Sequence, residues 1–283
     1  MSRIAYVNGR YVPFAEATVH VEDRGLQFAD SIYEVFAVRD GRSLDAEGHW
    51  ARLERSLREL GQGMPLSRVA LGHHVDETVR RNRVRNGLAY LQVTRGVAKR
   101  DHPFPPPDLP QTVIITARRT DRAKADAAAE TGIAVATMPD GRWSRCDIKT
   151  TALIANVLAK QAAREQGAYE AWLVDADGYV TEGASTNAWI VTNDGTLVTR
   201  ALSNAILPGV TRGSVKALAE ARQMKIEERP FTVAEALAAR EAFITSAGSF
   251  VLPVVKIDGQ AVGDGRPGRI SGDLRAAYLA SGL

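Results

Sequence analysis

The sequence predicts an α+β protein of two domains, and three features of its 283 residues lead to this prediction. Strands with alternating apolar side chains come in hairpin pairs, of which the first turns at Asn8-Gly9. Helices are interspersed among the strands without the regular strand–helix alternation of a parallel α/β fold. A polar, alanine-rich stretch near the middle of the chain has no firm apolar period, and we therefore expect it to link two domains.

The N-terminal half contains strands followed by two helices and two further strands. Residues 31–39 alternate in hydrophobicity up to the turn signal Asp40-Gly41, which predicts a strand with Tyr33 and Glu34 on opposite faces. Apolar residues at helical spacing then predict a helix from about residue 47. The full series expected here is a hairpin at 4–7 and 11–14, a strand at 31–39, helices at 47–60 and 66–84, and strands at 87–94 and 112–117.

A proline-rich loop at residues 102–108 separates the last two of these strands. Proline lacks a backbone N–H and cannot enter a sheet interior, so we expect this loop to be ordered by its prolines and to project. The interdomain linker is expected at residues 121–130. This division gives a small N-terminal domain of residues 1–120 and a larger C-terminal domain of residues 131–283.

The C-terminal half again groups its strands into hairpins, with turn signals at Asp177-Gly178 and at residues 193–195. No glycine-rich nucleotide-binding loop follows any strand, which argues against a Rossmann or P-loop fold. The expected elements are strands at 132–137, 170–174, 188–191, 196–199, 241–245 and 250–257, helices at 152–166 and from about 208, and a short C-terminal helix.

Composition excludes several classes of function. The single cysteine, Cys146, rules out an intrachain disulfide, and the five histidines lack the spacing of metal ligands, so we expect no metal site. The net charge of +3 is small and no basic run is interleaved with aromatic residues, which argues against a nucleic-acid partner. The longest apolar run is too short for a membrane span, and the N-terminus lacks a secretory signal. We therefore expect a cytoplasmic protein with no membrane partner.

Lys149 and Glu182 are candidates for the chemistry of a pyridoxal phosphate enzyme. A lysine amine can form a Schiff base with an aldehyde cofactor and then move protons. A carboxylate can hold a pyridine nitrogen in its protonated form, which makes the ring an electron sink. Taken alone, Lys149 would be an ordinary surface charge and Glu182 a turn residue, so the pair needs support from the rest of the chain.

Two short segments have the composition of phosphate-binding loops. Residues 208–212 resemble a helix start whose backbone N–H groups would face an anion. Residues 245–249 form a loop of small residues after a strand, which also suits backbone contact with an anion. An ordinary helix N-terminus and an ordinary turn are the alternatives.

Seven segments spread over nearly the whole chain carry a likeness to one known family. They are residues 22–28, 33–34, 91–96, 142–149, 157–161, 181–183 and 206–212. With these segments the chain resembles the fold-type IV aminotransferases, and most closely the D-amino-acid aminotransferases. The resemblance implies pyridoxal 5′-phosphate as the cofactor and transamination of D-amino acids with 2-oxo acids, in ping-pong order through an internal aldimine and a pyridoxamine phosphate form.

The resemblance also implies a set of cofactor-binding residues. Lys149 matches the Schiff-base lysine that moves the proton, and Glu182 matches the partner of the pyridine nitrogen. Arg52 matches the arginine that binds the phosphate. The other matching positions are Leu207 under the ring, Gly209, Val210 and Thr211 at the phosphate, and Ser246 and Ala247 in the second loop. The chain departs from the pattern at Ala247, where the family has a threonine hydroxyl, and Ser246 or Ser249 is a candidate to compensate.

Substrate choice rests, by the same resemblance, on Tyr33, Arg100 and His102. In the D-amino-acid enzymes these positions bind the substrate α-carboxylate, and the Arg-x-His pair comes from the neighbouring subunit. Because an arginine fork and a histidine donor suit a carboxylate, the pair makes chemical sense. The resemblance therefore implies a homodimer whose partners are small-molecule D-amino acids and 2-oxo acids.

Four further functions remain alternatives on the sequence. Within the same fold the chain could be an (R)-selective amine transaminase, a branched-chain L-amino-acid aminotransferase or an aminodeoxychorismate lyase, and Arg100 and His102 favour the D-amino-acid class over these. From a different class, it could be a non-catalytic protein that binds a phosphate ligand through its helix start and small-residue loops. Schiff-base formation by Lys149 would distinguish an enzyme from such a binding protein.

Overall fold

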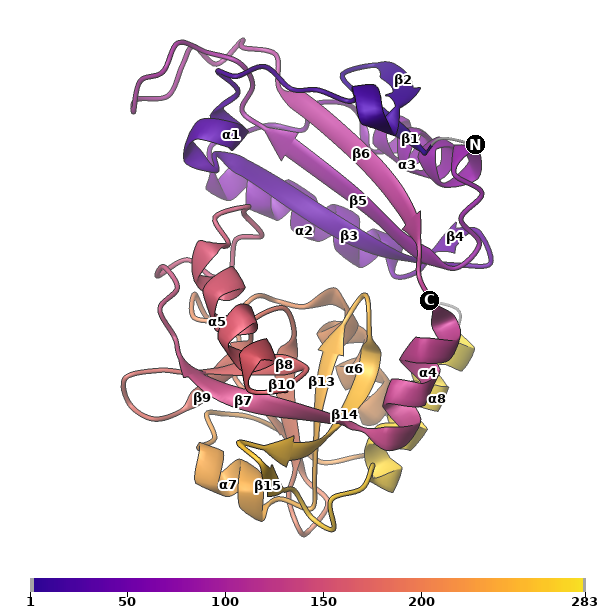
Figure 1. The fold of residues 1–283 in the computed structure, drawn as a ribbon, viewed down its shortest axis with the longest axis vertical. Coiled ribbons are helices and arrows are strands. Elements are labelled where there is room, and N and C mark those ends of the chain that lie inside the picture. Colours follow the sequence, from indigo (N-terminus) through magenta and orange to yellow (C-terminus); the bar gives the residue numbers. More distant parts are fainter. Residues whose placement is uncertain (1–2, 282–283) are drawn as a thin grey trace. The chain divides into compact units, whose positions relative to one another are not determined.

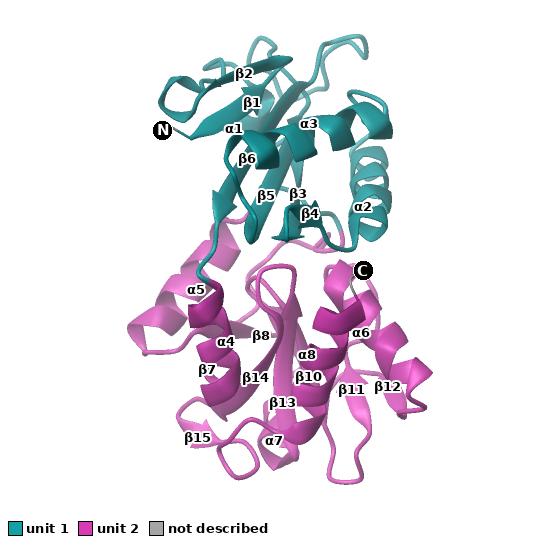
Figure 2. Ribbon diagram, turned by 90° about the vertical axis from the view of Figure 1, so that its right-hand side faces the viewer, with its two compact units in different colours: residues 1–121, 148–152 teal, residues 122–147, 153–283 magenta. Residues whose placement is uncertain are grey.

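Residues 3–281 of the computed structural model are described below, and they form two units. Unit 1 comprises the residues up to Asp121 together with Ile148–Ala152, and unit 2 comprises Arg122–Asp147 and the residues from Leu153 onward. Figure 1 shows the course of the chain, and Figure 2 colours the two units separately. The protein has the mixed helices and sheets of the α+β class, as the sequence predicts.

Unit 1 is built on a six-stranded antiparallel sheet with the strand order β2-β1-β6-β5-β3-β4. Its first hairpin turns at Asn8 and Gly9, which both have positive φ, as a two-residue turn between twisted strands requires. The elements are β1 (Ile4–Val7), β2 (Arg10–Pro13), η1 (Phe14–Glu16), α1 (Arg24–Phe28), β3 (Ser31–Arg39), β4 (Arg42–Ser43), α2 (Ala46–Glu59), α3 (Arg68–Arg81), β5 (Gly87–Thr94) and β6 (Thr112–Arg119).

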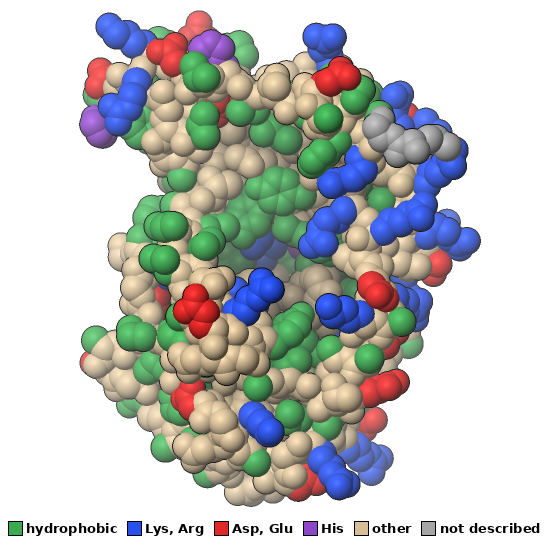
Figure 3. Space-filling view, in the orientation of Figure 1, with side chains coloured by type: hydrophobic (Ala, Val, Ile, Leu, Met, Phe, Trp, Pro, Cys, Tyr) green, Lys and Arg blue, Asp and Glu red, His purple; other side chains and the backbone are tan. Residues whose placement is uncertain are grey.

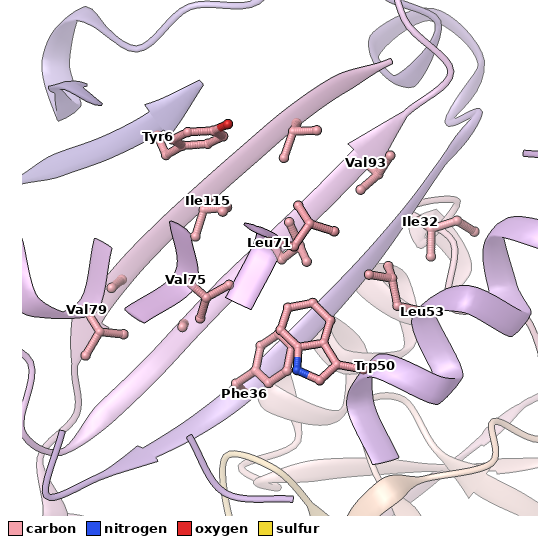
Figure 4. Packing of buried hydrophobic residues seen from close by; sticks show 14 of the residues in the cluster. Tyr6, Ile32, Phe36, Trp50, Leu53, Leu71, Val75, Val79, Val93 and Ile115 are labelled. Atoms are coloured by element: carbon pink, nitrogen blue, oxygen red, sulfur yellow. The ribbon is translucent and has the colours of Figure 1, made fainter. Parts of the chain in front are cut away.

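The core of unit 1 lies between this sheet and helices α2 and α3. Side chains alternate along β3, so that Ile32 and Phe36 face the helices while Tyr33 lies on the other face. They meet Trp50 and Leu53 of α2, as Figure 4 shows. Each fully buried side chain of this size contributes roughly 1.5–3 kcal/mol to folding. This packing fixes the orientation of both β3 and α2.

The short segment Ile148–Ala152 belongs to unit 1 because it runs beside the start of β3. The Tyr33 backbone N–H donates to the Lys149 carbonyl at 2.9 Å, and Thr150 forms an antiparallel bridge with Ile32. The sequence predicts Lys149 in the C-terminal domain of residues 131–283. The structure packs it with unit 1 instead, since backbone pairing across more than a hundred residues leaves no trace in the local sequence pattern.

Unit 2 is built on a nine-stranded mixed sheet with the order β12-β11-β10-β13-β14-β7-β8-β9, in which β15 also pairs with β14. The pairs β11–β12, β14–β7 and β7–β8 are parallel, and the others are antiparallel. Its strands are β7 (Ile133–Pro139), β8 (Glu170–Val174), β9 (Val180–Gly183), β10 (Asn187–Val191), β11 (Leu197–Thr199), β12 (Ile226–Glu228), β13 (Glu241–Ser246), β14 (Phe250–Ile257) and β15 (Gln260–Ala261).

Five helices complete unit 2. They are α4 (Arg122–Thr131), α5 (Ile154–Glu165), α6 (Val210–Ala221), α7 (Val233–Ala238) and α8 (Arg269–Ser281). Helix α5 packs on β7 and β8, α6 packs on β13, and α4 and α8 pack on β14. The buried side chains include Trp172, Trp189 and Phe243, of which the last two stack with ring centroids 5.5 Å apart. These contacts pack β10 against its neighbouring strands and α6 against the sheet.

The structure differs from the sequence-based elements at the predicted linker. Residues 121–130 were expected to be a linker, but nearly all of them form helix α4. Alanine is the best helix former, and Ala128 and Ala129 pack against the core of unit 2, so tertiary contact stabilises a helix without a clear apolar stripe. The short elements α1, β4, β12, α7 and β15 were not predicted, because segments this short carry too little periodic pattern.

Candidate active site

The predicted site residues fall into two groups, one in each unit, and the group in unit 1 includes Lys149. The Lys149 backbone N–H donates to the Ser56 hydroxyl at 3.4 Å, which ties it to α2. Its side-chain Nζ donates to the Tyr33 hydroxyl at 3.4 Å and lies 4.4 Å from the centre of that ring. Tyr33 in turn stacks on Tyr90, with centroids 5.5 Å apart. The structure thus brings together Lys149 and Tyr33, which the sequence analysis selected separately.

Arg52 lies in a buried ion pair that the sequence analysis missed. Its Nε and Nη2 atoms donate to the two carboxylate oxygens of Glu34 at 2.8 and 2.7 Å, and His49 Nδ1 lies 2.7 Å from the same carboxylate. Burial of Glu34 raises its pKa, but the positive charge and hydrogen bonds of Arg52, together with His49, hold that pKa at about 2. One edge of the Arg52 guanidinium is therefore fixed by a carboxylate that stays ionised.

Arg100 and His102 occupy the loop between β5 and β6, where both side chains are exposed. Figure 3 shows basic and histidine side chains on the surface of this loop, at the upper left. Both side chains lie against Phe28, with the Arg100 guanidinium 5.2 Å and the His102 ring 5.6 Å from its centre. Within residues 3–281, neither side chain makes an ion pair.

Glu182 is the centre of the group in unit 2. It lies within β9, inside the sheet and not in a turn, and is 4% exposed. Arg142 Nη1 donates to its Oε1, Asn187 Nδ2 donates to its Oε2 at 2.9 Å, and the Leu207 backbone N–H lies within 3.2 Å of both oxygens. All of these groups are donors, and together they stabilise a negative carboxylate in a fixed orientation.

Arg142 is itself held by Asp140, which neither the charge pattern nor the spacing had indicated. The Arg142 Nε and Nη2 atoms donate to the Asp140 carboxylate at 2.9 and 2.7 Å, and Nη2 also donates to the Ala205 carbonyl. Burial raises the pKa of Asp140, but the bonds from Arg142 and Thr181 lower it below its ordinary value. The cation beside Glu182 is thus fixed by a second carboxylate.

The start of α6 has the features of a phosphate cradle. Its N-cap, Gly209, makes no side-chain capping bond, which leaves the first backbone N–H groups of the helix without a side-chain acceptor. A Cβ at Gly209 would lie 2.0 Å from Asn187 Oδ1, so only glycine fits. Asn187 also donates to the Leu207 carbonyl at 3.0 Å. One asparagine therefore joins the Glu182 carboxylate to the loop before α6.

The second predicted phosphate loop is the tight turn between β13 and β14. The Ser246 and Ser249 hydroxyls lie 2.7 Å apart, and the Ser249 backbone N–H donates to Ser246 Oγ at 3.2 Å. Both hydroxyls thus contribute to the turn itself. Ala247 lies in this turn, next to Ser246.

No group of three or more His, Cys, Asp or Glu side chains within residues 3–281 is arranged to hold a metal ion. None of the helices in this range is both long and apolar enough to cross a membrane.

The residues present fit pyridoxal 5′-phosphate. Unit 2 offers a fixed carboxylate at Glu182 for a pyridine nitrogen, and the uncapped start of α6 at Gly209 for a phosphate. Unit 1 offers the amine of Lys149, next to the Tyr33 hydroxyl. The sequence had no signal for Asp140, whereas Glu34 and Arg142 lie within segments that carry the family likeness, although neither was given a role there.

Comparison with known proteins yields one consistent family. The model of the amino-transferase class IV family matches residues 31–257. The D-alanine aminotransferase of Bacillus licheniformis is 40% identical over 274 residues, which cover 97% of this chain and 95% of that protein. The D-alanine aminotransferase of Staphylococcus haemolyticus is 38% identical over 96% of this chain and 95% of that protein.

Solved structures agree on the fold. A branched-chain amino acid aminotransferase of T.th., solved with pyridoxamine 5′-phosphate, is 27% identical with a TM-score of 0.89 over 99% of this chain and 94% of that one. The Escherichia coli branched-chain amino acid aminotransferase also has a TM-score of 0.89, at 23% identity over 100% of this chain and 95% of that one. The chain has the fold-type IV architecture and belongs to the class IV aminotransferase family.

Proposed function

We propose that this protein is a pyridoxal 5′-phosphate-dependent transaminase that transfers the amino group of D-amino acids to 2-oxo acids. The observation that carries the proposal is the 40% identity, over 97% of the chain, to a D-alanine aminotransferase. The structures named as branched-chain enzymes share the fold at 23–27% identity, which is a weaker argument about substrate. Transfer through one site in two half-reactions predicts ping-pong kinetics.

The residues around Glu182 would hold the cofactor ring in this proposal. When bound, pyridoxal phosphate supplies an electron sink for the electrons released at the substrate Cα. Glu182, fixed by Arg142 and Asn187, pairs with the pyridine nitrogen. The remaining contacts are the Leu207 side chain under the ring, backbone N–H groups at Gly209, Val210, Thr211, Ser246 and Ala247 for the phosphate, and the Arg52 guanidinium for the same phosphate.

Lys149 would perform the proton transfer. Its Nζ first removes the proton from the substrate Cα as a general base. It then returns the proton later in the same half-reaction as a general acid. The Tyr33 hydroxyl, 3.4 Å from Nζ, accepts a hydrogen bond and so orients the amine. The segment that carries Lys149 is fixed by its backbone pairing with β3.

The substrate carboxylate would be bound by Tyr33, Arg100 and His102. The last two lie exposed on the β5–β6 loop of the single chain, which suits side chains that serve the site of a neighbouring subunit. An arginine fork binds a carboxylate through two parallel hydrogen bonds. The working unit in this proposal is therefore a homodimer, with Arg100 and His102 contributed across its interface.

The proposal is tested by a half-reaction survey of the purified holoenzyme. Visible absorbance of the bound cofactor is followed after addition of D-alanine, L-alanine, D-leucine and L-leucine without an oxo acid, and pyruvate is added afterward to restore it. We expect loss of the visible band with the D-amino acids only. A preparation that neither binds pyridoxal phosphate nor changes colour would favour a simple phosphate-ligand protein and would contradict the proposal.

A branched-chain L-amino-acid aminotransferase is the second candidate, because the solved structures named above are of that class. Loss of the band with L-leucine but not with D-alanine would establish it. Oxidation of (R)-1-phenylethylamine with pyruvate would add an (R)-amine activity to either function.

A further inference from the structure

Arg24, on the one-turn helix α1, makes contacts that none of the assignments above uses. It is only 3% exposed, and its Nε donates to the Asp30 carboxylate at 2.8 Å. Its other nitrogens reach the β5–β6 loop, where Nη1 donates to the Asp101 carbonyl at 2.6 Å and Nη2 to the His102 carbonyl at 3.3 Å. One buried guanidinium therefore joins the body of unit 1 to two successive peptide groups of the loop.

The acid partner of Arg24 is itself well fixed. Asp30 also accepts from Arg95 Nε at 2.7 Å, and Arg95 donates to the Leu60 carbonyl at the end of α2. Arg95 further lies over the ring of Phe104, 3.7 Å from its centre. Asp30 therefore links two arginines that both contact the loop, and it keeps an ion-pair partner if Arg24 is replaced.

Phe28 provides the second contact, one helical turn after Arg24. Its ring lies 4.7 Å from the Arg24 guanidinium, 5.2 Å from that of Arg100 and 5.6 Å from the ring of His102. Cations and flat polar rings are attracted to an aromatic face. Arg24 thus binds the carbonyls of two successive residues of the loop, Asp101 and His102, and Phe28 lies against the side chains of Arg100 and His102.

We propose that helix α1 is the positioning element of the substrate-carboxylate site. Arg24 fixes the backbone of the β5–β6 loop, and Phe28 orients Arg100 and His102, so that their donors are aimed before the substrate arrives. Arg24 and Phe28 are positioning residues, since they act through the loop and touch no reacting atom. This inference rests on the proposed role of Arg100 and His102.

The test uses the holoenzyme and the variants Arg24→Met, Arg24→Lys and Phe28→Leu. Arg24→Met keeps the bulk of the side chain but removes its hydrogen bonds. Arg24→Lys keeps the charge beside Asp30 but cannot bridge the acid and two carbonyls at once. Arg85→Met is the matched control, because Arg85 is an exposed arginine of unit 1 whose only described ion pair, with Asp40, is 3.5 Å long.

Two readouts separate positioning from general damage. Hydrogen exchange followed by mass spectrometry reports the order of residues 99–105, and steady-state kinetics separate KM from kcat for D-alanine. We expect faster exchange in this segment and a KM raised about tenfold in Arg24→Met, with kcat within about twofold and the cofactor content unchanged. Arg24→Lys should fall between Arg24→Met and the wild type, Phe28→Leu should raise KM by less than Arg24→Met does, and Arg85→Met should match the wild type.

Three results would overturn the inference. One is unchanged loop exchange and unchanged KM in Arg24→Met. Another is a fall in kcat or cofactor content at constant KM, which indicates a structural role only. If Arg24→Met does not fold, the third result replaces the first two. It is a KM equal to that of the wild type in both Arg24→Lys and Phe28→Leu. If the wild type itself does not react with D-amino acids, the proposed function fails, whereas the exchange measurement still decides whether Arg24 anchors the loop.

Discussion

The two units hold their charged site residues by different means. In unit 2, Glu182 is enclosed by donors from a strand and two loops, and Arg142 beside it is fixed by Asp140. In unit 1, Arg52 is fixed just as firmly by Glu34, but Arg100 and His102 lie exposed on a loop that is held through its backbone. Buried carboxylates thus position the groups assigned to the cofactor, while carbonyl contacts position those assigned to the substrate.

This contrast has a physical reason. A cofactor that never leaves during the reaction is best served by partners that are already oriented and desolvated, because no reorganisation is then needed when charge moves. Substrates of different sizes must enter and leave, which is easier next to an exposed loop with a few anchoring bonds.

Replacing Lys149 by alanine should have the largest effect. Removal of a residue that serves as both nucleophile and proton carrier should lower turnover by about 10³-fold or more. The measurement is transamination of D-alanine, with the cofactor content determined in parallel. The control is Lys256→Ala, at an exposed lysine of unit 2, which should keep wild-type turnover. Normal turnover by Lys149→Ala would show that Lys149, the residue of unit 1 assigned to proton transfer, does not take part in the reaction.

The Glu34 ion pair should make unit 1 sensitive to acid. The pKa of Glu34 is about 2, below its ordinary value of 4.5, so its stabilisation is complete above pH 4.5 and is lost as the pH falls toward 2. This shift corresponds to about 3 kcal/mol. Glu34→Gln should therefore lower the free energy of unfolding by roughly that amount at pH 7, and the difference from wild type should shrink at pH 3.

Urea unfolding at the two pH values measures this effect. Glu16→Gln, at an exposed position of the same unit, should change the free energy of unfolding by less than about 0.5 kcal/mol. A constant difference between wild type and Glu34→Gln across this pH range would show that Arg52 is not fixed by a charged Glu34.

Two glycines of unit 2 offer a matched pair. A Cβ at Gly209 would lie 2.0 Å from the buried Asn187 side chain, and Gly209→Ala should therefore cost about 1–3 kcal/mol of stability and weaken pyridoxal phosphate binding about tenfold. At Gly213, four residues further along α6, a Cβ meets open space, so Gly213→Ala should stabilise the helix by up to about 1 kcal/mol. Thermal unfolding and cofactor titration measure both effects. Equal behaviour of the two variants would argue against a closely fitted cradle.

The last effect concerns the reactivity of Cys146 and leaves turnover and stability unchanged. Burial raises the pKa of this thiol to about 11, although the nearby Arg142 charge acts in the opposite direction. At pH 8 the thiol should react with a disulfide reagent roughly 10²-fold more slowly than a free cysteine, and the rate should rise with each pH unit up to 10. Unfolded protein serves as the control with ordinary reactivity. Fast reaction in the folded protein would indicate that the Arg142 region is more open than the structure shows.

Much of the fold could be predicted from the sequence, because its longer elements have clear periodicity. The hairpin at Asn8-Gly9, the strand β3 and the helix α2 were predicted to within two residues. The prediction was wrong for the weakly periodic segment at α4, where alanines with high helix propensity form a helix that packs on the core of unit 2. The same limit applies to Lys149, which pairs with a strand more than a hundred residues earlier in the chain.

By itself, the sequence determined the fold class, most of the secondary structure, the Lys149 and Glu182 candidates and the family likeness, since these depend on local pattern or on long matching segments. Only the tertiary structure decided which charges hold the site residues in place. Glu34 pairs with Arg52, Arg142 with Glu182, and Arg24 with the loop at Asp101. Such partners are brought together by sheet pairing and burial, and a buried charge needs a partner whose position no local sequence pattern specifies.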